Sequence, residues 1–250
     1  MKIVVIGGSG LIGSQLVGML RERGHDVVAA SPSSGVNAVT GEGLAGALEG
    51  SQVVVDVSNS PSFEDKAALE FFERSSGHLR AAEIAAGVKH HVALSVVGTQ
   101  RMPDSGYMRA KARQEVLIRG SEVAFTIVHA TQFFEFLATI AGAYGQGDTI
   151  RLPAGNLQPI AARDVAAALA DYALGAPVND VVEIAGPEKA PLHELVARYL
   201  AAIGDKRKVV RDDTASYFGA KLQPDTLVPA QAARLGATDL DSWIAQARKR

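Results

Sequence analysis

Short apolar runs alternate with longer amphipathic stretches through the first half of the chain. The apolar runs cover residues 3–6, 27–30, 53–57, 92–97 and 124–128, with a weaker one at 36–39. Helical periodicity appears at residues 11–23, 64–86 and 107–119, and in a short stretch at 44–48. Apolar strands that are separated by helices are typical of a parallel sheet with helices on both faces. We therefore expect an α/β protein with a doubly wound parallel sheet.

The pattern becomes less regular after about residue 130. Glycine and proline are frequent in residues 141–159, and the stretches that follow predict a helix at 164–174, a strand at 181–184 and a helix at 192–203, then short helices to about Trp243. We expect a core of residues 1–130 and a smaller C-terminal α/β lobe of residues 131–250, packed on the core as one structural unit. Ligands of doubly wound sheets bind beyond the carboxyl ends of the strands, so chemistry is sought there.

A glycine-rich turn joins the first apolar run to the first helix. In GGSGLIG, Gly7 permits a tight turn, Gly10 lets the backbone approach a pyrophosphate, and Gly13 lets the helix pack closely on the strand. The N–H groups at the helix start then hold phosphates. This predicts a Rossmann-like dinucleotide site, the alternative being a glycine turn without a ligand. The predicted contacts are Gly7, Ser9, Gly10, Leu11, Ile12 and Gly13.

The end of the second strand bears on which dinucleotide binds. An acidic residue there would hold the ribose hydroxyls of NAD, but this strand runs into Ser31, Pro32, Ser33 and Ser34. The missing carboxylate and the hydroxyls of Ser31, Ser33 and Ser34 favour the 2′-phosphate of NADP. The missing arginine weakens that argument, since phosphates usually attract one. NADP is the expected cofactor; NAD and a plain polar turn remain open alternatives.

Two stretches place a tyrosine four residues before a lysine. SGYMRAK contains Tyr107 and Lys111, and SYFGAK contains Tyr217 and Lys221. Positions four apart share one face of a helix, so the phenol and the ammonium group meet there. Tyr107 follows the apolar run at 92–97 through a loop, whereas no strand leads into Tyr217. We expect the first pair to line the cofactor site and the second to pack at the surface.

Several segments together resemble the short-chain dehydrogenase/reductase superfamily. They are GGSGLIGS, VVVDVSNS, ALSVVG, YMRAK and FTIVHATQFFEF, which span about the first 135 residues. More narrowly, the chain looks like the atypical branch of NmrA-like proteins and NADPH-dependent quinone reductases. The resemblance implies that Ser95 binds the substrate oxygen and that Tyr107 exchanges a proton with it. It also implies that Lys111 holds the nicotinamide ribose and lowers the pKa of Tyr107. His129 stands where relatives frequently carry arginine.

Further polar residues follow the strands and are candidates for cofactor contact. Those after the third apolar run, Ser58, Asn59 and Ser60, are expected beside a ribose, although a turn before Pro61 explains them almost as well. The segment Thr131, Gln132 and Phe133 is expected to form the nicotinamide wall, with a core role for the phenylalanine as the alternative. His90 and His91 are expected to be structural, because the sequence shows no carboxylate partner for them.

Composition narrows the range of partners. The net charge of −2 gives no electrostatic footprint for nucleic acid or an anionic membrane, and no apolar stretch is long enough to cross a bilayer. With no cysteine and no metal-ligand spacing among the six histidines, we expect no metal site. The N-terminal apolar run breaks at glycine without a cleavage site, so a cytoplasmic location is expected. A small-molecule substrate is expected, and a homo-oligomer is left open.

These observations favour an NAD(P)H-dependent oxidoreductase that transfers hydride between nicotinamide and a small carbonyl, quinone or similar compound. The alternative is an NmrA-like redox sensor that binds the dinucleotide without turnover. The Ser95, Tyr107 and Lys111 set favours the enzyme, although a sensor could keep these residues as ribose ligands. A nucleotide-sugar epimerase or dehydratase is a third reading, disfavoured because such relatives are usually longer than this chain.

Overall fold

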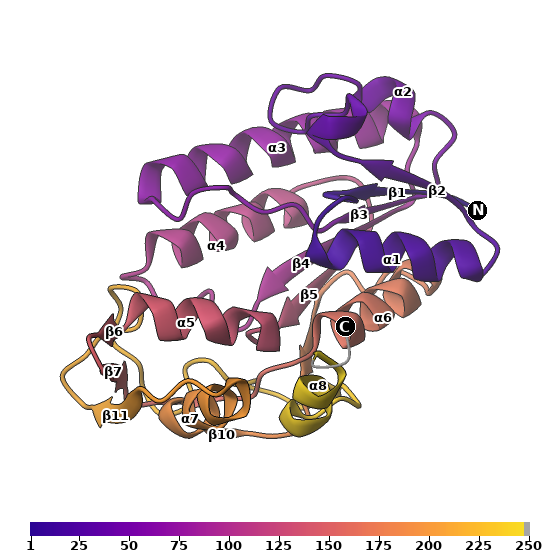
Figure 1. Cartoon of the computed structure of the whole chain (residues 1–250). Helices are drawn as coiled ribbons and strands as arrows, with labels where there is room; N and C mark the ends of the chain where they lie inside the picture. Colours follow the sequence, from indigo (N-terminus) through magenta and orange to yellow (C-terminus); the bar gives the residue numbers. More distant parts are fainter. Residues whose placement is uncertain (248–250) are drawn as a thin grey trace. The chain divides into compact units, whose positions relative to one another are not determined.

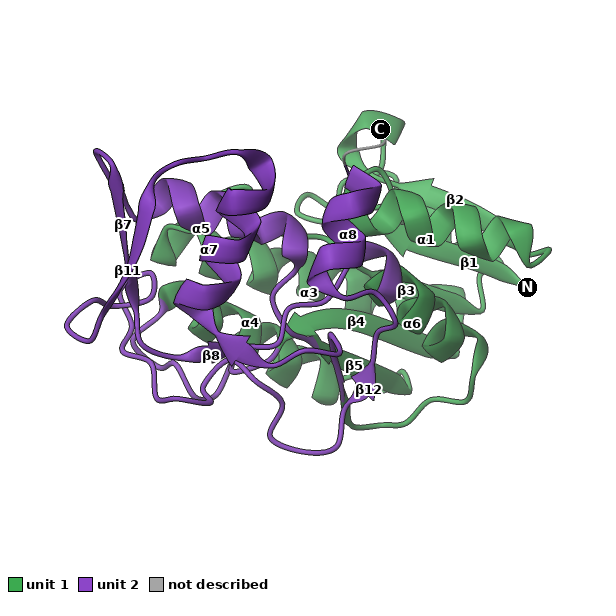
Figure 2. Ribbon diagram, turned by 60° about the horizontal axis from the view of Figure 1, so that its bottom comes forward, with its two compact units in different colours: residues 1–96, 106–129, 165–182 green, residues 97–105, 130–164, 183–250 purple. Residues whose placement is uncertain are grey.

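The computed structural model describes residues 1–247 (Figure 1). The chain divides into two compact units (Figure 2). The first unit contains residues 1–96, 106–129 and 165–182, and the second contains residues 97–105, 130–164 and 183–250. The chain therefore passes between the units several times, and each unit is described separately below.

A parallel sheet forms the centre of the fold. Its strand order is β12-β9-β5-β4-β3-β1-β2, and the pairings β1–β2, β1–β3, β3–β4 and β9–β12 are parallel. The strands are β1 (Lys2–Ile6), β2 (Asp26–Ala30), β3 (Val53–Asp56), β4 (His90–Val96), β5 (Phe125–Ala130), β9 (Val181–Ala185) and β12 (Arg234–Leu235). Fully apolar strands such as β1 suit a sheet that helices cover on both faces. The expected doubly wound α/β architecture is confirmed.

The helices of the first unit cover the two faces of this sheet. On one face α3 (Asp65–Ala86) packs along α4 (Gly106–Arg119), and on the other lie α1 (Leu11–Glu22) and α6 (Ala162–Leu174) (Figure 1). An Arg23–Asp171 ion pair of 2.7 Å joins the end of α1 to α6. The buried side chains of α3 include Phe72 and Leu79, which explains its orientation on the sheet.

The strand expected at residues 36–39 is absent. Gly35, Gly41 and Gly43 all adopt left-handed backbone conformations, with φ near +77°, +81° and +72°, and Asn37 N–H donates to Glu42 O at 2.8 Å. These turns bend the chain too tightly for sheet pairing, although Ala38 is still buried. The loop instead leads into the short helix α2 (Leu44–Leu48), which the sequence predicted.

Within its described residues, the second unit contains two small sheets and three α-helices. The sheets are β11-β7-β6 and β10-β8. The elements are β6 (Gly145–Gln146), β7 (Thr149–Pro153), β8 (Asn156–Leu157), β10 (Ala190–Pro191), β11 (Lys208–Asp212), α5 (Leu137–Ala143), α7 (Leu192–Ile203) and α8 (Leu240–Ala247), with a 3₁₀ turn at Phe134–Phe136. The expectation of a tail of short helices was wrong: β11 pairs with β7 in parallel, and within the described part of the tail only α8 is an α-helix.

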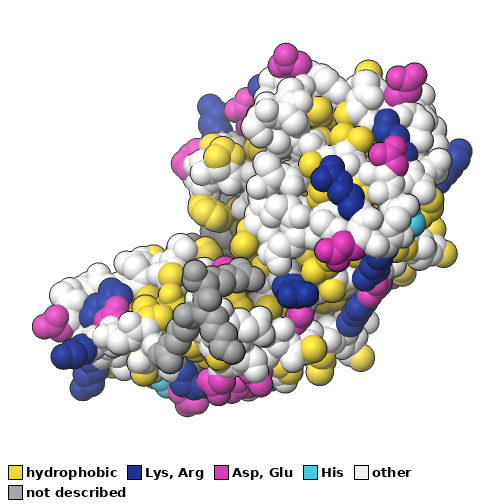
Figure 3. All heavy atoms as spheres, turned by 45° about the vertical axis from the view of Figure 1, so that its right-hand side comes forward, with side chains coloured by type: hydrophobic (Ala, Val, Ile, Leu, Met, Phe, Trp, Pro, Cys, Tyr) yellow, Lys and Arg dark blue, Asp and Glu magenta, His cyan; other side chains and the backbone are white. Residues whose placement is uncertain are grey.

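Neither surface charge nor helix hydropathy among the described residues indicates a special partner. On the face drawn in Figure 3, acidic and basic side chains are interspersed, with neither sign gathered into one field. Among the described helices, none combines the length and the apolar character that a membrane span requires.

Candidate functional site

The glycine turn, residues 7–13, is built so that side chains are excluded. Gly7 has φ +79°, and a Cβ on it would lie 2.9 Å from the backbone nitrogen of Ser58. A Cβ on Gly13 would lie 2.1 Å from the carbonyl oxygen of Gly7. The N–H of Gly7 donates to Ala30 O at 2.9 Å. The turn is therefore held closely against the ends of β2 and β3, at the carboxyl edge of the sheet.

The start of α1 offers hydrogen-bond donors. Its N-cap is Gly10, which has no side chain to cap the first N–H groups, and the first turn of a helix leaves such groups without intrahelical partners. Ser9, Gly10 and Leu11 are exposed, whereas the side chain of Ile12 is buried, so its backbone alone can reach a ligand. The uncapped donors and the cradle of glycines fit a pyrophosphate. Contact with a dinucleotide stays a prediction for each of these residues.

The serines after β2 form a compact 3₁₀ turn, η1 (Pro32–Ser34). Ser34 Oγ donates to Ala29 O and accepts from Ser31 N–H, while the hydroxyls of Ser31 and Ser33 lie 2.9 Å apart. Part of their hydrogen-bonding capacity therefore holds the turn itself. Ser33 is exposed and Ser31 is buried. Binding of a 2′-phosphate here stays a prediction, and the choice between NADP and NAD stays open.

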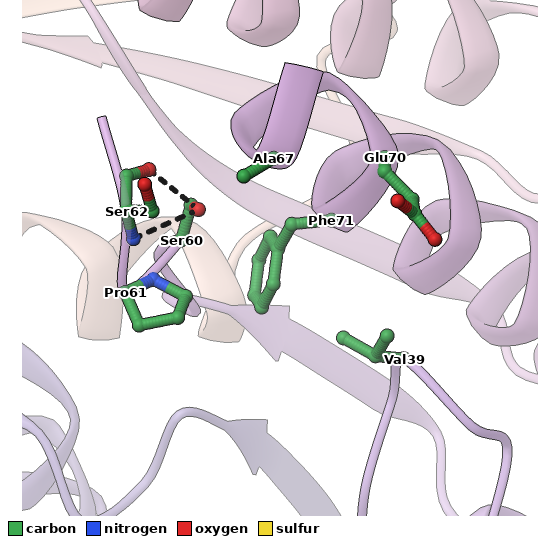
Figure 4. Close-up of a pocket in the computed structure, with 7 residues that line it drawn as sticks. All are labelled: Val39, Ser60, Pro61, Ser62, Ala67, Glu70 and Phe71. Carbon is green, nitrogen blue, oxygen red and sulfur yellow. Dashed lines mark hydrogen bonds between the residues drawn. The ribbon is translucent and has the colours of Figure 1, made fainter. Parts of the chain in front are cut away.

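The segment after β3 lies beside the glycine turn. Ser58 Oγ donates to Asp56 Oδ1 at 2.6 Å, Asn59 Oδ1 accepts from Tyr107, and Ser60 Oγ donates to Ser62 O at 2.7 Å. An open hollow of about 220 Å³ adjoins this segment. It is lined by Val39, Ser60, Pro61, Ser62, Ala67, Glu70 and Phe71 (Figure 4). The faces of Phe71 and Pro61 make it a largely apolar surface next to the predicted ribose contacts.

Tyr107 occupies the first turn of α4. Its phenol donates to Asn59 Oδ1 at 2.9 Å, and its ring packs against Phe63 and Phe72 with centroids 5.1 and 6.1 Å away. Burial raises the pKa of Tyr107 to about 12, so the phenol is protonated at neutral pH. The implied lowering of this pKa by Lys111 is not seen in the free protein, because burial dominates and Lys111 is engaged elsewhere.

Lys111 lies inside the first unit, only 3% exposed. Its Nζ donates to Leu94 O at 2.8 Å and to Gln114 Oε1, and it lies 4.6 Å from the centroid of the Phe72 ring. Burial lowers the pKa of Lys111 to about 8, while the carboxylates of Asp56 and Glu115 act in the opposite direction. The ammonium group is thus held by protein groups, and contact with a nicotinamide ribose stays a prediction.

Ser95 is brought together with Glu115 and His129. Its hydroxyl donates to Glu115 Oε1 at 2.5 Å, and His129 Nε2 lies 2.8 Å from the same oxygen. All three side chains are buried. Burial would raise the pKa of Glu115, but His129, Ser95 and Lys111 lower it below its ordinary value. Because the Ser95 hydrogen is directed at Glu115, its role as a donor to substrate stays a prediction that needs a rearrangement of this hydrogen bond.

Several polar partners in the structure were not predicted from the sequence. Glu115 lies four residues after Lys111, so its helical face was readable from the sequence, but Asp56 and Gln114 were not singled out. The view that His91 has no carboxylate partner was wrong. Its Nδ1 lies 2.6 Å from Glu83 Oε1, and both side chains are buried. Little in the sequence indicated this pairing, since Glu83 lies eight residues before His91 and on a different element, α3.

The remaining predicted residues belong to the second unit. Thr131 Oγ1 donates to Gln158 O at 2.6 Å, Gln132 is buried with its Oε1 lacking a hydrogen-bond partner, and Phe133 bridges to Ile160. Their role as a nicotinamide wall stays a prediction. Tyr217 is only 4% exposed, so the expected surface packing of the second tyrosine–lysine pair was wrong for its phenol.

Part of the sequence matches a known protein family. Residues 3–94 match the model of the NAD dependent epimerase/dehydratase family. No curated protein matches the sequence. The matched family is not specifically the NmrA-like branch that the sequence suggested.

Solved structures with low sequence identity share the whole fold. MoeE5 in complex with UDP-glucuronic acid and NAD has a TM-score of 0.76 at 17% identity, covering 100% of this chain and 99% of that one. A short-chain dehydrogenase/reductase superfamily protein from Agrobacterium tumefaciens with bound NAD gives 0.72 at 17%, with coverage of 100% and 96%. A dTDP-4-dehydrorhamnose reductase from Bacillus anthracis in complex with NADP gives 0.69 at 12%, with coverage of 96% and 91%. The chain therefore has the fold of these dinucleotide-bound structures, and its residues 3–94 carry the epimerase/dehydratase match.

Proposed function

We propose that the protein is an NAD(P)H-dependent oxidoreductase acting on a small carbonyl, quinone or similarly unsaturated compound. The observation that carries this proposal is the glycine turn, in which Gly7 and Gly13 leave no room for a Cβ and the uncapped start of α1 offers phosphate-binding donors. The turn lies at the carboxyl edge of a parallel sheet, where dinucleotides bind in such folds. The bound nicotinamide would supply or accept the hydride.

Tyr107 would act as the general acid in the reducing direction. Its phenol is protonated at neutral pH, since its pKa is raised to about 12, and its hydrogen bond to Asn59 Oδ1 would be exchanged for one to the substrate. A substrate oxygen that gains electron density could take this proton. Ser95 would orient that oxygen after exchanging its hydrogen bond to Glu115, and Lys111 would bind the ribose. Thr131, Gln132 and Phe133 are further proposed contacts of the nicotinamide.

NADP is the proposed cofactor, with NAD as the alternative. No carboxylate follows β2 to repel a 2′-phosphate, and Ser33 is exposed there. Of the three solved structures described above, two were crystallised with NAD and one with NADP. They do not favour one dinucleotide for this chain, so both must be titrated.

A nucleotide sugar is a second candidate substrate. The epimerase/dehydratase match and the alignment with 99% of MoeE5, which was crystallised with UDP-glucuronic acid, favour its inclusion. Chain length does not disfavour this chemistry, because the present chain covers 99% of the MoeE5 chain. The test panel should therefore hold UDP-sugars and dTDP-sugars beside quinones, aldehydes and ketones.

The first test is NAD(P)H oxidation by the purified protein over this panel, with Tyr107→Phe alongside. We expect turnover to fall at least about 100-fold in the variant, the scale of general acid catalysis, with dinucleotide affinity nearly unchanged. Lys221→Met, which alters the second tyrosine–lysine pair, is the matched control and should retain activity. Turnover by Tyr107→Phe at the wild-type rate would rule out the acid role. Tight dinucleotide binding without turnover on any compound would favour the sensor instead.

A further inference from the structure

A buried carboxylate lies directly beneath the predicted ribose contacts. Asp56, the last residue of β3, is 2% exposed. Its Oδ1 accepts from the N–H of Ser58 at 2.9 Å and from the Ser58 hydroxyl at 2.6 Å, and its Oδ2 accepts from Gln114 Nε2 at 3.0 Å. One carboxylate therefore holds both the segment that follows β3 and the helix α4.

Gln114 links this carboxylate to Lys111. The glutamine is 1% exposed, and while its Nε2 donates to Asp56, its Oε1 accepts from Lys111 Nζ. An ionised carboxylate only accepts and an ammonium group only donates, so a single orientation of the amide satisfies both neighbours. The amide thus transmits the position of Asp56 to the ammonium group.

Stability alone explains this arrangement poorly. Placing two charges in an apolar interior costs several kcal/mol for each ion in general, and well-packed apolar residues of similar volume are often no less stable. The hydrogen bonds from Asp56 through Gln114 to Lys111 instead connect two groups that are proposed to contact the cofactor. These groups are the segment of Ser58 and Asn59, and Lys111 itself. Tyr107, on the same helix, donates to Asn59 Oδ1 of this segment.

We propose that Asp56 and Gln114 are positioning residues, which hold the Ser58–Asn59 segment and the Lys111 ammonium group in the geometry that binds the dinucleotide. The inference rests on the proposed function, because it concerns the same site. Neither residue is assigned contact with the cofactor. Their effect passes through the backbone of the segment and through the lysine.

Groups from four elements surround the Lys111 ammonium group. β3 contributes Asp56, α4 contributes Glu115, β4 contributes the Leu94 carbonyl and α3 contributes the Phe72 ring. Asp56 also acts on His91 of β4, whose pKa it helps to raise. Removing the charge of Asp56 should therefore lower the pKa of Lys111 further below about 8, while Glu115 still opposes the change.

Two single variants and the double variant test whether the orientation of the Gln114 amide between Asp56 and Lys111 matters. Asp56→Asn keeps the shape but places the asparagine N–H₂ group opposite Nε2 of Gln114, so that two donors face each other. If the Gln114 amide flips, its Nε2 instead faces the Lys111 ammonium group, which is also a donor. Gln114→Glu sets two carboxylates against each other. In the double variant Asp56→Asn with Gln114→Glu, the new carboxylate accepts from both the asparagine and Lys111, so the hydrogen bonds are complementary again.

The readouts are NADPH and NADH affinity by fluorescence, kcat and KM with any substrate found, and the titration of ¹³Cε-labelled lysine by NMR. Lys111→Met identifies the Lys111 resonance. Thr126→Val is the control for a lost buried hydrogen bond, because Thr126 bonds to His90 near the beginning of β5, away from the carboxyl edge. Thermal unfolding of every variant reports its stability.

We expect each single variant to weaken dinucleotide binding about tenfold or more, the size of one lost charge-assisted hydrogen bond. Asp56→Asn should move the Lys111 titration to lower pH, and the double variant should regain most of the affinity. Thr126→Val should lose stability without these changes. Wild-type affinity and an unmoved Lys111 titration in both single variants, or no recovery in the double variant, would overturn the inference.

Failure of the proposed function gives a different result. A wild-type protein that binds the dinucleotide but turns over no compound would refute the oxidoreductase, while the affinity and NMR series would still support or overturn the positioning role. A wild-type protein that binds neither dinucleotide would overturn both.

Discussion

Two adjacent histidines at the start of β4 have opposite electrostatic surroundings. Burial, together with the neighbouring His91, lowers the pKa of His90 to about 4. Burial would also lower the pKa of His91, but the Glu83 carboxylate 2.6 Å away raises it above its ordinary value. The two residues therefore contribute to stability with opposite dependence on pH.

The pH dependence of unfolding tests this difference through His91→Gln and His90→Gln. Because its folded-state pKa is raised, the stabilisation from His91 is complete below about pH 6.5 and is lost as the pH rises through the folded-state value. For His90, stability is present above about pH 6.5 and declines as the pH falls towards about 4. Urea unfolding between pH 5 and 9 should show His91→Gln most destabilised at low pH. A pH-independent loss in His91→Gln would contradict the raised pKa.

Polar pairing at the scale of single residues was the least predictable feature. Ser95 and Glu115 are twenty residues apart, and Asp56 and Gln114 are fifty-eight apart. Such contacts depend on how a helix packs on a strand, which periodicity along one element does not specify. The prediction that Tyr107 and Lys111 begin the helix after β4 was nevertheless confirmed in position, since both lie on α4. The binding of substrate by Tyr107 and of the ribose by Lys111 stays a prediction.

At the scale of elements, α1 contains two glycines in very different surroundings. A Cβ on Gly13 would lie 2.1 Å from Gly7 O and 2.8 Å from the Gly8 Cα, whereas a Cβ on Gly18 would meet nothing within 4 Å. The first glycine fixes the approach of the helix to the turn. The second only adds flexibility to the unfolded chain.

Gly13→Ala and Gly18→Ala separate these roles. Gly13→Ala must displace backbone, so we expect a loss of about 1–3 kcal/mol in the free energy of unfolding and loss of dinucleotide binding. Gly18→Ala should gain about 0.5–1 kcal/mol, the usual helical preference for alanine over glycine, and should bind normally. Chemical denaturation and fluorescence titration measure both effects. Equal affinity in the two variants would argue against a phosphate site at this turn.

The elements of the first half were predictable because each repeats a simple pattern. Strands such as β1 are continuously apolar and α1 is amphipathic, so both followed from periodicity. The prediction of a strand at residues 36–39 was wrong because three of these four residues are apolar, as in a strand, while the flanking glycines are left-handed and turn the chain. In the tail, β11 is a strand only because β7 pairs with it, a long-range contact that no local pattern reveals.

At the scale of the whole molecule, the two units are interleaved in sequence. The first unit consists of two earlier segments and residues 165–182. Residues 165–182 contain most of α6 and the beginning of β9. Within that unit, Asn179 N–H donates to Phe125 O and Arg23 pairs with Asp171. A cut at residue 130 would therefore remove part of the sheet and a covering helix from the unit that carries the glycine turn.

Truncation tests this interdependence. We expect a fragment of residues 1–130 to lack a cooperative thermal transition and to bind no dinucleotide, because it lacks α6 and the Arg23–Asp171 ion pair and leaves part of one face of the sheet uncovered. A fragment of residues 1–182 contains the whole first unit and is the matched control. It should unfold cooperatively, and its midpoint should rise with dinucleotide concentration, as ligand binding to the folded state requires. Circular dichroism melts with and without NADPH measure both. Cooperative unfolding and NADPH-dependent stabilisation of the shorter fragment would show instead that residues 165–182 are dispensable to the first unit.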